Sequence, residues 1–241
     1  YQQLNDSLLQ IENEFYSTIR PKRVTQPGEA PLAALRRAGI EYVEIRCIDV
    51  SPFTPVGIDA SQIRFLDTFL LHCLLEDSPA CDDTERALQA ANLSTVVNRG
   101  REPGLRLRTP VGDASLEELA GELLGGMTGI AELLDNAHAS ESYRAALAAQ
   151  QAKVQDSALT PSARVLAEMR DRDLPFFRLA MAYSEHWARH FREQALSDTC
   201  RQRFEQETRQ SLAAQQQLEA GDELTFEEYL ARFFGQYRTL F

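Results

Sequence analysis

The sequence predicts an α+β fold in which a few strands near the start of the chain are followed by a mostly helical region. Residues 40–50 are rich in β-branched side chains and lie between Gly39 and Pro52, as is typical of a strand. Residues 105–108 alternate leucine with arginine, which indicates a second, short strand. From residue 115 onward, apolar side chains recur at helical spacing in one segment after another.

The composition limits the classes of protein to consider. The 241 residues are enough for one large domain or two small ones, and 44% of them are hydrophobic, so the chain can bury a core. The formal net charge of −11 and the isoelectric point of about 4.9 argue against nucleic-acid binding and against a basic membrane-surface patch. No apolar run reaches the length of a membrane span. Only Lys22 and Lys153 among the basic residues are lysines.

The cysteine pattern indicates reduced thiols rather than disulfides or a zinc site. No two cysteines form a C-x-x-C pair, and their spacing fits no zinc motif. Cys47 and Cys73 lie in apolar patterns, so we expect them to be core residues. Because no signal peptide is evident either, the expected compartment is the reducing cytoplasm. The four are Cys47, Cys73, Cys81 and Cys200.

The first residues combine a helical pattern with a basic segment. Apolar residues at helical spacing predict a helix over residues 2–15 that ends ahead of Pro21. Because this pattern is already running after Tyr1, and the first residue is not Met, we expect a fragment of a longer protein. Residues 16–23 then predict a basic loop that can hold phosphate or carboxylate groups, or simply an ordinary basic loop. Its candidate binding residues are Tyr16, Arg20, Lys22 and Arg23.

The predicted strand over residues 40–50 carries a charged row. Side chains alternate along a strand, so Glu44 and Arg46 share one face while Val43, Ile45 and Cys47 share the other, which suits a core. A rise of about 3.3 Å per residue places Glu44 and Arg46 about 7 Å apart, too far for a tight ion pair but suitable for gripping one ligand. A carboxylate can hold Mg²⁺ while a guanidinium holds the phosphate that the ion touches. The alternative is a solvated strand face with a cross-strand charge pair.

Helices account for most of the remaining chain. Asp59 and Gln62 predict a capping box at the start of one helix, whose expected buried stripe is Ile63, Leu66, Leu70, Cys73 and Leu74. His72 in this helix is read as a packed or surface histidine rather than a ligand. His186 and His190 have the spacing of a zinc pair, but no third ligand is evident. The other expected helices are 32–38, capped by Gly39, then 83–98, 116–136 with an interruption at Gly125-Gly126, 140–156, 161–170, 175–195, 198–220 and 225–234.

A set of short motifs occurs in a fixed order along the chain. The first are residues 12–17 (Glu-Asn-Glu-Phe-Tyr-Ser), 19–23 (Ile-Arg-Pro-Lys-Arg), 39–46 (Gly-Ile-Glu-Tyr-Val-Glu-Ile-Arg) and 49–53 (Asp-Val-Ser-Pro-Phe). They continue with residues 64–67, Asn92, 100–105 and 160–166. In this combination the chain resembles the C-terminal half of the bacterial, proteobacterial-type glutamate–cysteine ligase, or γ-glutamylcysteine synthetase. The match is dense over residues 1–110 and sparser up to about residue 170.

The resemblance implies part of an antiparallel catalytic sheet of the glutamine-synthetase type over residues 1–110, with a helical part over residues 111–241. The implied enzyme uses ATP to activate the γ-carboxylate of L-glutamate as an acyl phosphate. It then joins that group to the amine of L-cysteine in the first step of glutathione synthesis. Further Mg²⁺ ligands belong to the half of the enzyme outside this chain, so we expect the fragment to be inactive alone.

The resemblance also assigns roles to individual residues. Glu44 occupies the position of a Mg²⁺ ligand, and Arg46 that of the catalytic contact to the transferring phosphate. Tyr16 corresponds to a contact for the acceptor cysteine. Arg20, Lys22 and Arg23 carry over as general phosphate or carboxylate contacts in substrate binding.

Two other functions stay open on the sequence. One is a different ATP-dependent carboxylate–amine ligase of the glutamine synthetase superfamily, which would keep Glu44 and Arg46 and differ around Tyr16. The other is a non-catalytic helical interaction module, which would suit the acidic, helix-rich part after Val111.

Overall fold

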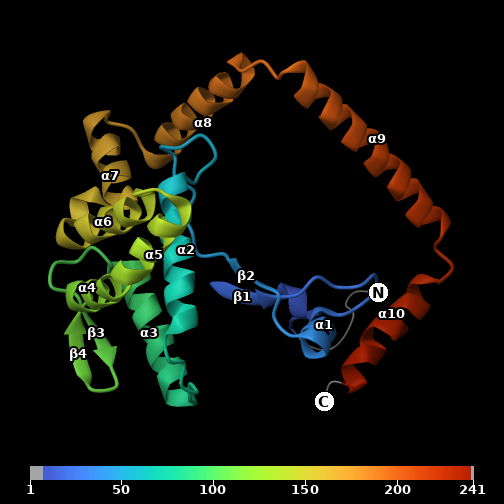
Figure 1. The fold of residues 1–241 in the computed structure, drawn as a ribbon, viewed down its shortest axis with the longest axis horizontal. Coiled ribbons are helices and arrows are strands. Elements are labelled where there is room, and N and C mark those ends of the chain that lie inside the picture. The colour runs from blue at the N-terminus through green and yellow to red at the C-terminus, as the bar shows by residue number, and fades with distance from the viewer. Residues whose placement is uncertain (1–7, 240–241) are drawn as a thin grey trace. The chain divides into compact units, whose positions relative to one another are not determined.

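The computed structural model describes residues 8–239, which divide into two compact units. We call residues 8–49 with 193–239 the sheet unit, and residues 50–192 the helical unit (Figure 1). The sheet unit contains η1 (Glu12–Glu14), β1 (Ile19–Lys22), α1 (Pro31–Ala38), β2 (Tyr42–Ile45), α9 (Asp198–Ala220), α10 (Phe226–Gly235) and η3 (Gln236–Thr239). The helical unit contains α2 (Ala60–Leu75), α3 (Asp83–Arg99), β3 (Arg106–Thr109), β4 (Gly112–Ser115), α4 (Leu116–Gly126), α5 (Thr128–His138), α6 (Ser142–Gln155), η2 (Ser157–Leu159), α7 (Pro161–Asp171) and α8 (Phe176–Glu193).

The expected α+β class, with few strands and many helices, is confirmed. β1 and β2 form an antiparallel pair in which Arg20 lies opposite Glu44 and Lys22 opposite Tyr42. The basic segment that the sequence predicts as a loop therefore contains a strand, and that prediction is wrong. Pro21 is compatible with the strand because, within the described residues, β1 pairs with β2 alone and so keeps one outer edge.

The sheet is shorter and less covered than the sequence predicts. The strand expected over residues 40–50 spans only Tyr42–Ile45. Its apolar row does not form a core, because the Val43 residue is 42% exposed and Ile19 on the same face is 44% exposed. Cys47 is exposed as well, so its expected place in a core is wrong.

The predicted N-terminal helix is also wrong where the structure describes it. Residues 2–7 lie outside the described part, and residues 8–15 contain only the 3₁₀ turn η1. Leu8 is 96% exposed, so the apolar spacing has nothing to pack against. A short helix without a packing partner is marginal in water, which explains why spacing alone misleads here.

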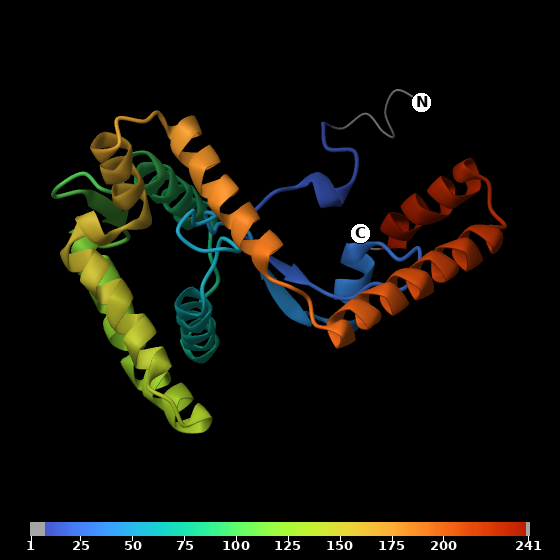
Figure 2. The ribbon, with the colours of Figure 1, turned by 90° about the horizontal axis from the view of Figure 1, so that it is seen from above.

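Local end signals place the helices correctly. α1 ends at Gly39, whose φ of 72° suits glycine, and its amide donates to the Leu35 carbonyl. α2 begins with the capping box that Asp59 and Gln62 predict. The later helices follow the expected ranges, with α4 and α5 separated at Met127 beside the Gly125-Gly126 interruption. α9 continues into α10 through a turn at Gly221, and every residue of α9 is exposed (Figures 1 and 2).

The core of the helical unit lies where α6 contacts α2, α4 and α5. Its buried residues are Leu124, Met127, Ala131 and Leu147, and Phe65, Phe69, Tyr143 and Val154 pack against them. α2 does not bury the stripe that the sequence predicts, since Ile63 is 48% and Leu74 77% exposed. Cys73 is exposed too. The buried side of α2 runs instead through Phe65, Thr68, Phe69 and His72, which is also a continuous face at helical spacing.

His72 is packed, which is one of the two environments, packed or at the surface, that the sequence predicts for it. It is 8% exposed, and its Nδ1 lies 3.6 Å from a carboxylate oxygen of Glu76. Gly126 leaves room for the ring, because a Cβ at that position would lie 3.1 Å from His72 Cε1. The glycine pair at the end of α4 therefore ends one helix and admits the imidazole of another.

The expected strand over residues 105–108 is observed as β3, which pairs with β4. Leu105 and Leu107 are buried while Arg106 and Arg108 face solvent, as the alternation predicts. β4 was not predicted, because its Gly-Asp-Ala-Ser sequence carries no strand signal. In the described part of the chain, no helix is both long and apolar enough to cross a membrane.

Asp135 near the end of α5 organises the start of α6. It is 2% exposed, and its carboxylate accepts hydrogen bonds from Ser140 Oγ (2.9 Å), Tyr143 N (2.9 Å), Arg144 N (3.1 Å) and Arg144 Nε (3.0 Å). Burial alone would raise the pKa of Asp135, but the amides of Tyr143 and Arg144, with the Arg144 and Ser140 side chains, lower it to about 2. The ionised carboxylate is thus the form that the fold stabilises.

We expect Met127→Ala to lower the free energy of unfolding by about 2–5 kcal/mol, because it leaves a cavity at a residue with no exposed surface. Urea unfolding followed by circular dichroism measures this loss. Met181→Ala is the matched control, since Met181 is 42% exposed and should lose far less. Equal losses at the two positions would contradict the placement of the core.

We expect Asp135 to stabilise the fold fully above pH 3.8, its ordinary pKa, and to lose that contribution as the pH falls through about 2. The sign follows because the folded state has the lower pKa and therefore binds the proton less readily. Asp135→Asn should accordingly be less stable than the unsubstituted chain at neutral pH, with a gap that narrows in acid. Melting curves over this pH range test it, and a gap that is independent of pH would contradict it.

Candidate functional site

The charged face of the β1–β2 sheet brings together residues that the sequence predicts as separate candidates. The register places Arg20 and Lys22 of β1 on the same face as Tyr42 and Glu44 of β2. Arg46 follows β2, and its amide donates a 2.8 Å hydrogen bond to the Thr18 carbonyl, which extends the pairing beyond the strand ends. Arg20, Lys22, Glu44 and Arg46 are all half-buried, whereas Ile19, Pro21 and Val43 on the opposite face are exposed.

The Glu44 carboxylate lies between two cations. Its Oε1 is 3.0 Å from Arg46 Nε, and its Oε2 is 3.2 Å from Lys22 Nζ. Hydrogen bonding from Arg46 lowers the pKa of Glu44 most strongly, and Lys22 adds to this against the opposing effect of burial. The expectation that Glu44 and Arg46 lie too far apart for an ion pair is therefore wrong. The 7 Å estimate describes the backbone, and both side chains are long enough to lean across it.

The second oxygen of Glu44 is paired with Lys22. Oε2 is closed off from solvent and lies 3.2 Å from the Lys22 ammonium, whose hydrogen bonding also lowers the pKa of the carboxyl. A carboxylate oxygen has more than one lone pair, so Oε2 can accept a further ligand beside Lys22.

Tyr16 and Arg46 are also in contact. The Tyr16 hydroxyl donates a 3.1 Å hydrogen bond to the Arg46 backbone carbonyl. The Arg46 guanidinium carbon lies 5.6 Å from the centre of the Tyr16 ring, within the range of a cation–π interaction. Tyr16 itself is 66% exposed, so its ring edge is open to a ligand while its hydroxyl is held.

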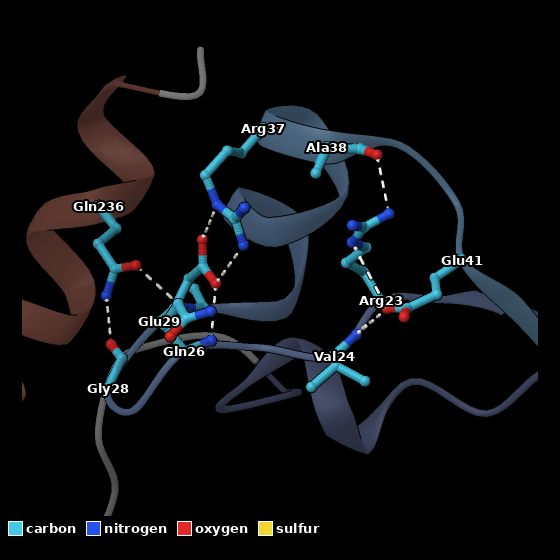
Figure 3. A network of polar contacts seen from close by, with 10 residues as sticks. Arg23, Val24, Gln26, Gly28, Glu29, Arg37, Ala38, Glu41 and Gln236 are labelled. Carbon is cyan, nitrogen blue, oxygen red and sulfur yellow. Dashed lines mark hydrogen bonds and ion pairs between the residues drawn. The ribbon is translucent and has the colours of Figure 1, made fainter.

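Arg23, by contrast, is used by the fold (Figure 3). Its Nη1 donates to the Ala38 carbonyl at 3.0 Å, and its Nε lies 3.5 Å from Glu41 Oε2. Glu41 Oε2 also accepts a 3.1 Å hydrogen bond from the Val24 amide. These contacts join the end of β1 to the start of β2, so a substrate role for Arg23 stays a prediction. The sequence analysis assigned no role to Glu41, whose contacts form only once the two strands pair.

The histidine pair on α8 flanks an anchored indole. The Trp187 ring centre lies 4.5 Å from that of His186 and 5.6 Å from that of His190. Trp187 Nε1 donates a 2.8 Å hydrogen bond to the Pro52 carbonyl, which ties α8 to the loop before α2. Among residues 8–239, no group of three or more His, Cys, Asp or Glu side chains has the arrangement of a metal site.

Comparison with known proteins gives a consistent result. A family model described as glutamate–cysteine ligase matches residues 1–96. The chain is 49% identical over 231 residues to the glutamate–cysteine ligase of Pseudomonas putida strain KT2440, which covers 96% of this chain and 44% of that enzyme. The glutamate–cysteine ligase of Azotobacter vinelandii strain DJ is 48% identical over the same shares of the two chains.

A solved structure extends the likeness to the fold. The crystal structure of glutamate–cysteine ligase from Francisella tularensis in complex with AMP matches with a TM-score of 0.89 and 32% sequence identity. The match covers 98% of this chain and 47% of that one. The chain therefore spans a little under half the length of the relatives it matches.

We expect Arg46→Met to raise the pKa of Glu44 more than Lys22→Met does, because the Arg46 hydrogen bond has the larger effect. The carboxyl ¹³C shift of Glu44, followed through a pH titration, measures both changes. Arg36→Met on the neighbouring helix is a control that should leave this pKa unchanged. A larger rise with Lys22→Met would contradict the order of the two contacts.

Proposed function

Because this chain belongs to the bacterial glutamate–cysteine ligase family, as its motifs predict, we propose that it is part of an ATP-dependent ligase. The complete protein would join the γ-carboxylate of L-glutamate to the amine of L-cysteine. The observation that carries this proposal is the half-buried group of Glu44, Lys22 and Arg46 on one face of β1–β2, with Tyr16 against Arg46. Its charges suit a nucleotide phosphate that is being transferred to a carboxylate.

Phosphoryl transfer requires little covalent chemistry from a protein and much positioning and neutralisation of charge. Arg46 offers a planar guanidinium that can donate two parallel hydrogen bonds to phosphate oxygens. Its Nε is paired with Glu44 at 3.0 Å, which restrains the plane of the guanidinium. Lys22 places an ammonium beside the same carboxylate and adds positive charge where the phosphate would lie.

Glu44 is the residue of this chain that would hold Mg²⁺. Its Oε2 is paired with Lys22 at 3.2 Å but, as a carboxylate oxygen, has a further lone pair, and a lowered pKa keeps the carboxylate ionised, as metal binding requires. Mg²⁺ prefers six oxygen ligands at close range, so Glu44 supplies one part of the set and other ligands must complete it. When bound, Mg²⁺ would supply positive charge that neutralises the charge developing on phosphate.

Tyr16 is positioned to contact the acceptor amino acid. Its hydroxyl is held by the Arg46 carbonyl at 3.1 Å, so the ring has a fixed position beside the guanidinium. We propose that the exposed part of the ring orients the acceptor amino acid, cysteine, toward the acyl phosphate. Arg20 lies opposite Glu44 in the register and can hold a carboxylate of an amino-acid substrate.

We expect two conservative substitutions in the complete protein to reduce turnover steeply. Glu44→Gln keeps the volume but removes the charge, so the loss should be partly recovered at high Mg²⁺ concentration. Arg46→Lys keeps the charge but loses the planar pair of donors, and should lower kcat by roughly 10²–10³ with a smaller effect on the KM for ATP. Phosphate release that depends on ATP, glutamate and cysteine is the measurement.

Matched controls lie on the exposed helix α9. Glu219→Gln and Arg209→Lys make the same chemical changes away from the sheet and should leave kcat unchanged. Near-normal turnover in both Glu44→Gln and Arg46→Lys would mean that the charged row is only a solvated strand face. A preference for an amine other than cysteine would indicate a sister carboxylate–amine ligase instead.

A further inference from the structure

The side chain of Gln236, near the C-terminal end of the described chain, is bonded to a turn more than 200 residues earlier in sequence (Figure 3). Its Nε2 donates a 2.8 Å hydrogen bond to the Gly28 carbonyl, and its Oε1 accepts one of 2.9 Å from the Ala30 amide. The carboxamide therefore satisfies a backbone acceptor and a backbone donor two residues apart. A primary amide suits this arrangement because it carries a donor and an acceptor side by side in one plane.

The turn that Gln236 grips is the most buried part of the sheet unit. Ala30 and Ala34 have no exposed surface, and the other fully buried hydrophobic residues of the described chain lie in the helical unit. The same turn is held from a second side by Glu12, whose Oε1 accepts a 3.0 Å hydrogen bond from the Leu32 amide. Glu12 and Gln236 thus close the two sides of a very small core.

Next to Gln236, the Tyr237 hydroxyl and the Glu12 carboxylate are both largely closed off from solvent and interact with each other. Burial, together with the negative charge and hydrogen bonding of Glu12, raises the pKa of Tyr237 to about 12. The N-terminal turn and the C-terminal segment therefore meet over the turn at residues 28–32.

This core is directly connected to the charged strands. Residues 23–41 form the whole connection from β1 to β2, and the Arg23–Glu41 contact closes its base. Inside the connection, Arg37 donates two hydrogen bonds of 2.8 and 3.0 Å to Glu29. The Arg37 hydrogen bonds and the Gln26 amide lower the pKa of Glu29 to about 2. A displacement of the turn at Gly28 would therefore reach the ends of both strands through a short, cross-linked segment.

We infer that Gln236 is a positioning residue for the β1–β2 site, and that η3 must be docked on the turn for Lys22, Glu44 and Arg46 to keep their mutual geometry. This inference rests on the proposed ligase function for its catalytic consequence. Gln236 acts through the connection between the strands and not through contact with a substrate.

The test compares Gln236→Leu, which removes both hydrogen bonds, with Gln216→Leu on the exposed helix α9 as the matched control. In the complete protein, Gln236→Leu should raise the KM for an anionic substrate, ATP or glutamate, by roughly 5–30-fold while kcat changes less. It should also raise the pKa of Glu44, as read from its carboxyl ¹³C shift, and speed hydrogen exchange of the Ala30 amide. The control should change none of these quantities.

A second variant tests whether the hydrogen bond to the Gly28 carbonyl is the cause of the change in KM. Gln236→Glu keeps the acceptor for the Ala30 amide but points a charged oxygen at the Gly28 carbonyl. Protonation of the introduced carboxyl restores a donor, so the difference in KM between Gln236→Glu and the unsubstituted protein should shrink as the pH falls. A difference in KM that is independent of pH would overturn the inference.

Two other outcomes of these experiments bear on the inference. If Ala30 exchange speeds up in Gln236→Leu while KM and the Glu44 pKa stay unchanged, Gln236 only stabilises the fold and the inference is overturned. If the unsubstituted complete protein has no ligase activity, the proposed function fails, and the Glu44 pKa alone decides whether Gln236 positions the site.

Discussion

The ion pairs of Glu44 with Lys22 and Arg46 determine the character of the β1–β2 sheet. A two-stranded sheet is marginal in water unless something covers one face, and here the charged face is covered better than the apolar one. The cross-strand pair to Lys22 and the same-strand pair to Arg46 take the place of apolar packing between the strands. The same arrangement that holds the strands together also gathers the groups of the proposed phosphate-binding site.

The two units reach stability by different means. In the helical unit, large side chains around Met127 exclude water along the contacts of α6 with α2, α4 and α5. Among its described residues, the sheet unit buries only the small hydrophobic residues Ala30 and Ala34, and it relies on directed polar contacts around them. A core built from polar contacts transmits displacement in particular directions, because each hydrogen bond constrains an orientation as well as a distance. Residues remote in sequence can therefore affect the geometry of the charged strands.

Much of the fold was predictable from local sequence signals such as helix caps. The features that were not predicted depend on packing between segments that are far apart in sequence. Gly39 and Asp59 fix helix ends within one turn, so their caps can be read directly from the sequence. The face that α2 buries could not be read in this way, because two adjacent faces are apolar and only its partners select between them. The charged row was predictable from alternation, whereas the Gln236 contacts join segments that no local pattern connects. The short motifs and their order along the chain indicated the family, because together they include several of the predicted site residues.

The scarcity of lysine has a practical consequence for handling this protein. Of the two lysines, Lys22 lies beside Glu44 in the candidate site, and burial lowers the pKa of Lys153. Within this chain, acylating reagents used for fluorescent labelling or surface immobilisation would therefore modify the candidate site, or a partly buried amine of which a larger share is unprotonated because its pKa is lowered. Maleimide coupling would not avoid the candidate site either, because Cys47, next to Arg46, is exposed along with Cys73, Cys81 and Cys200.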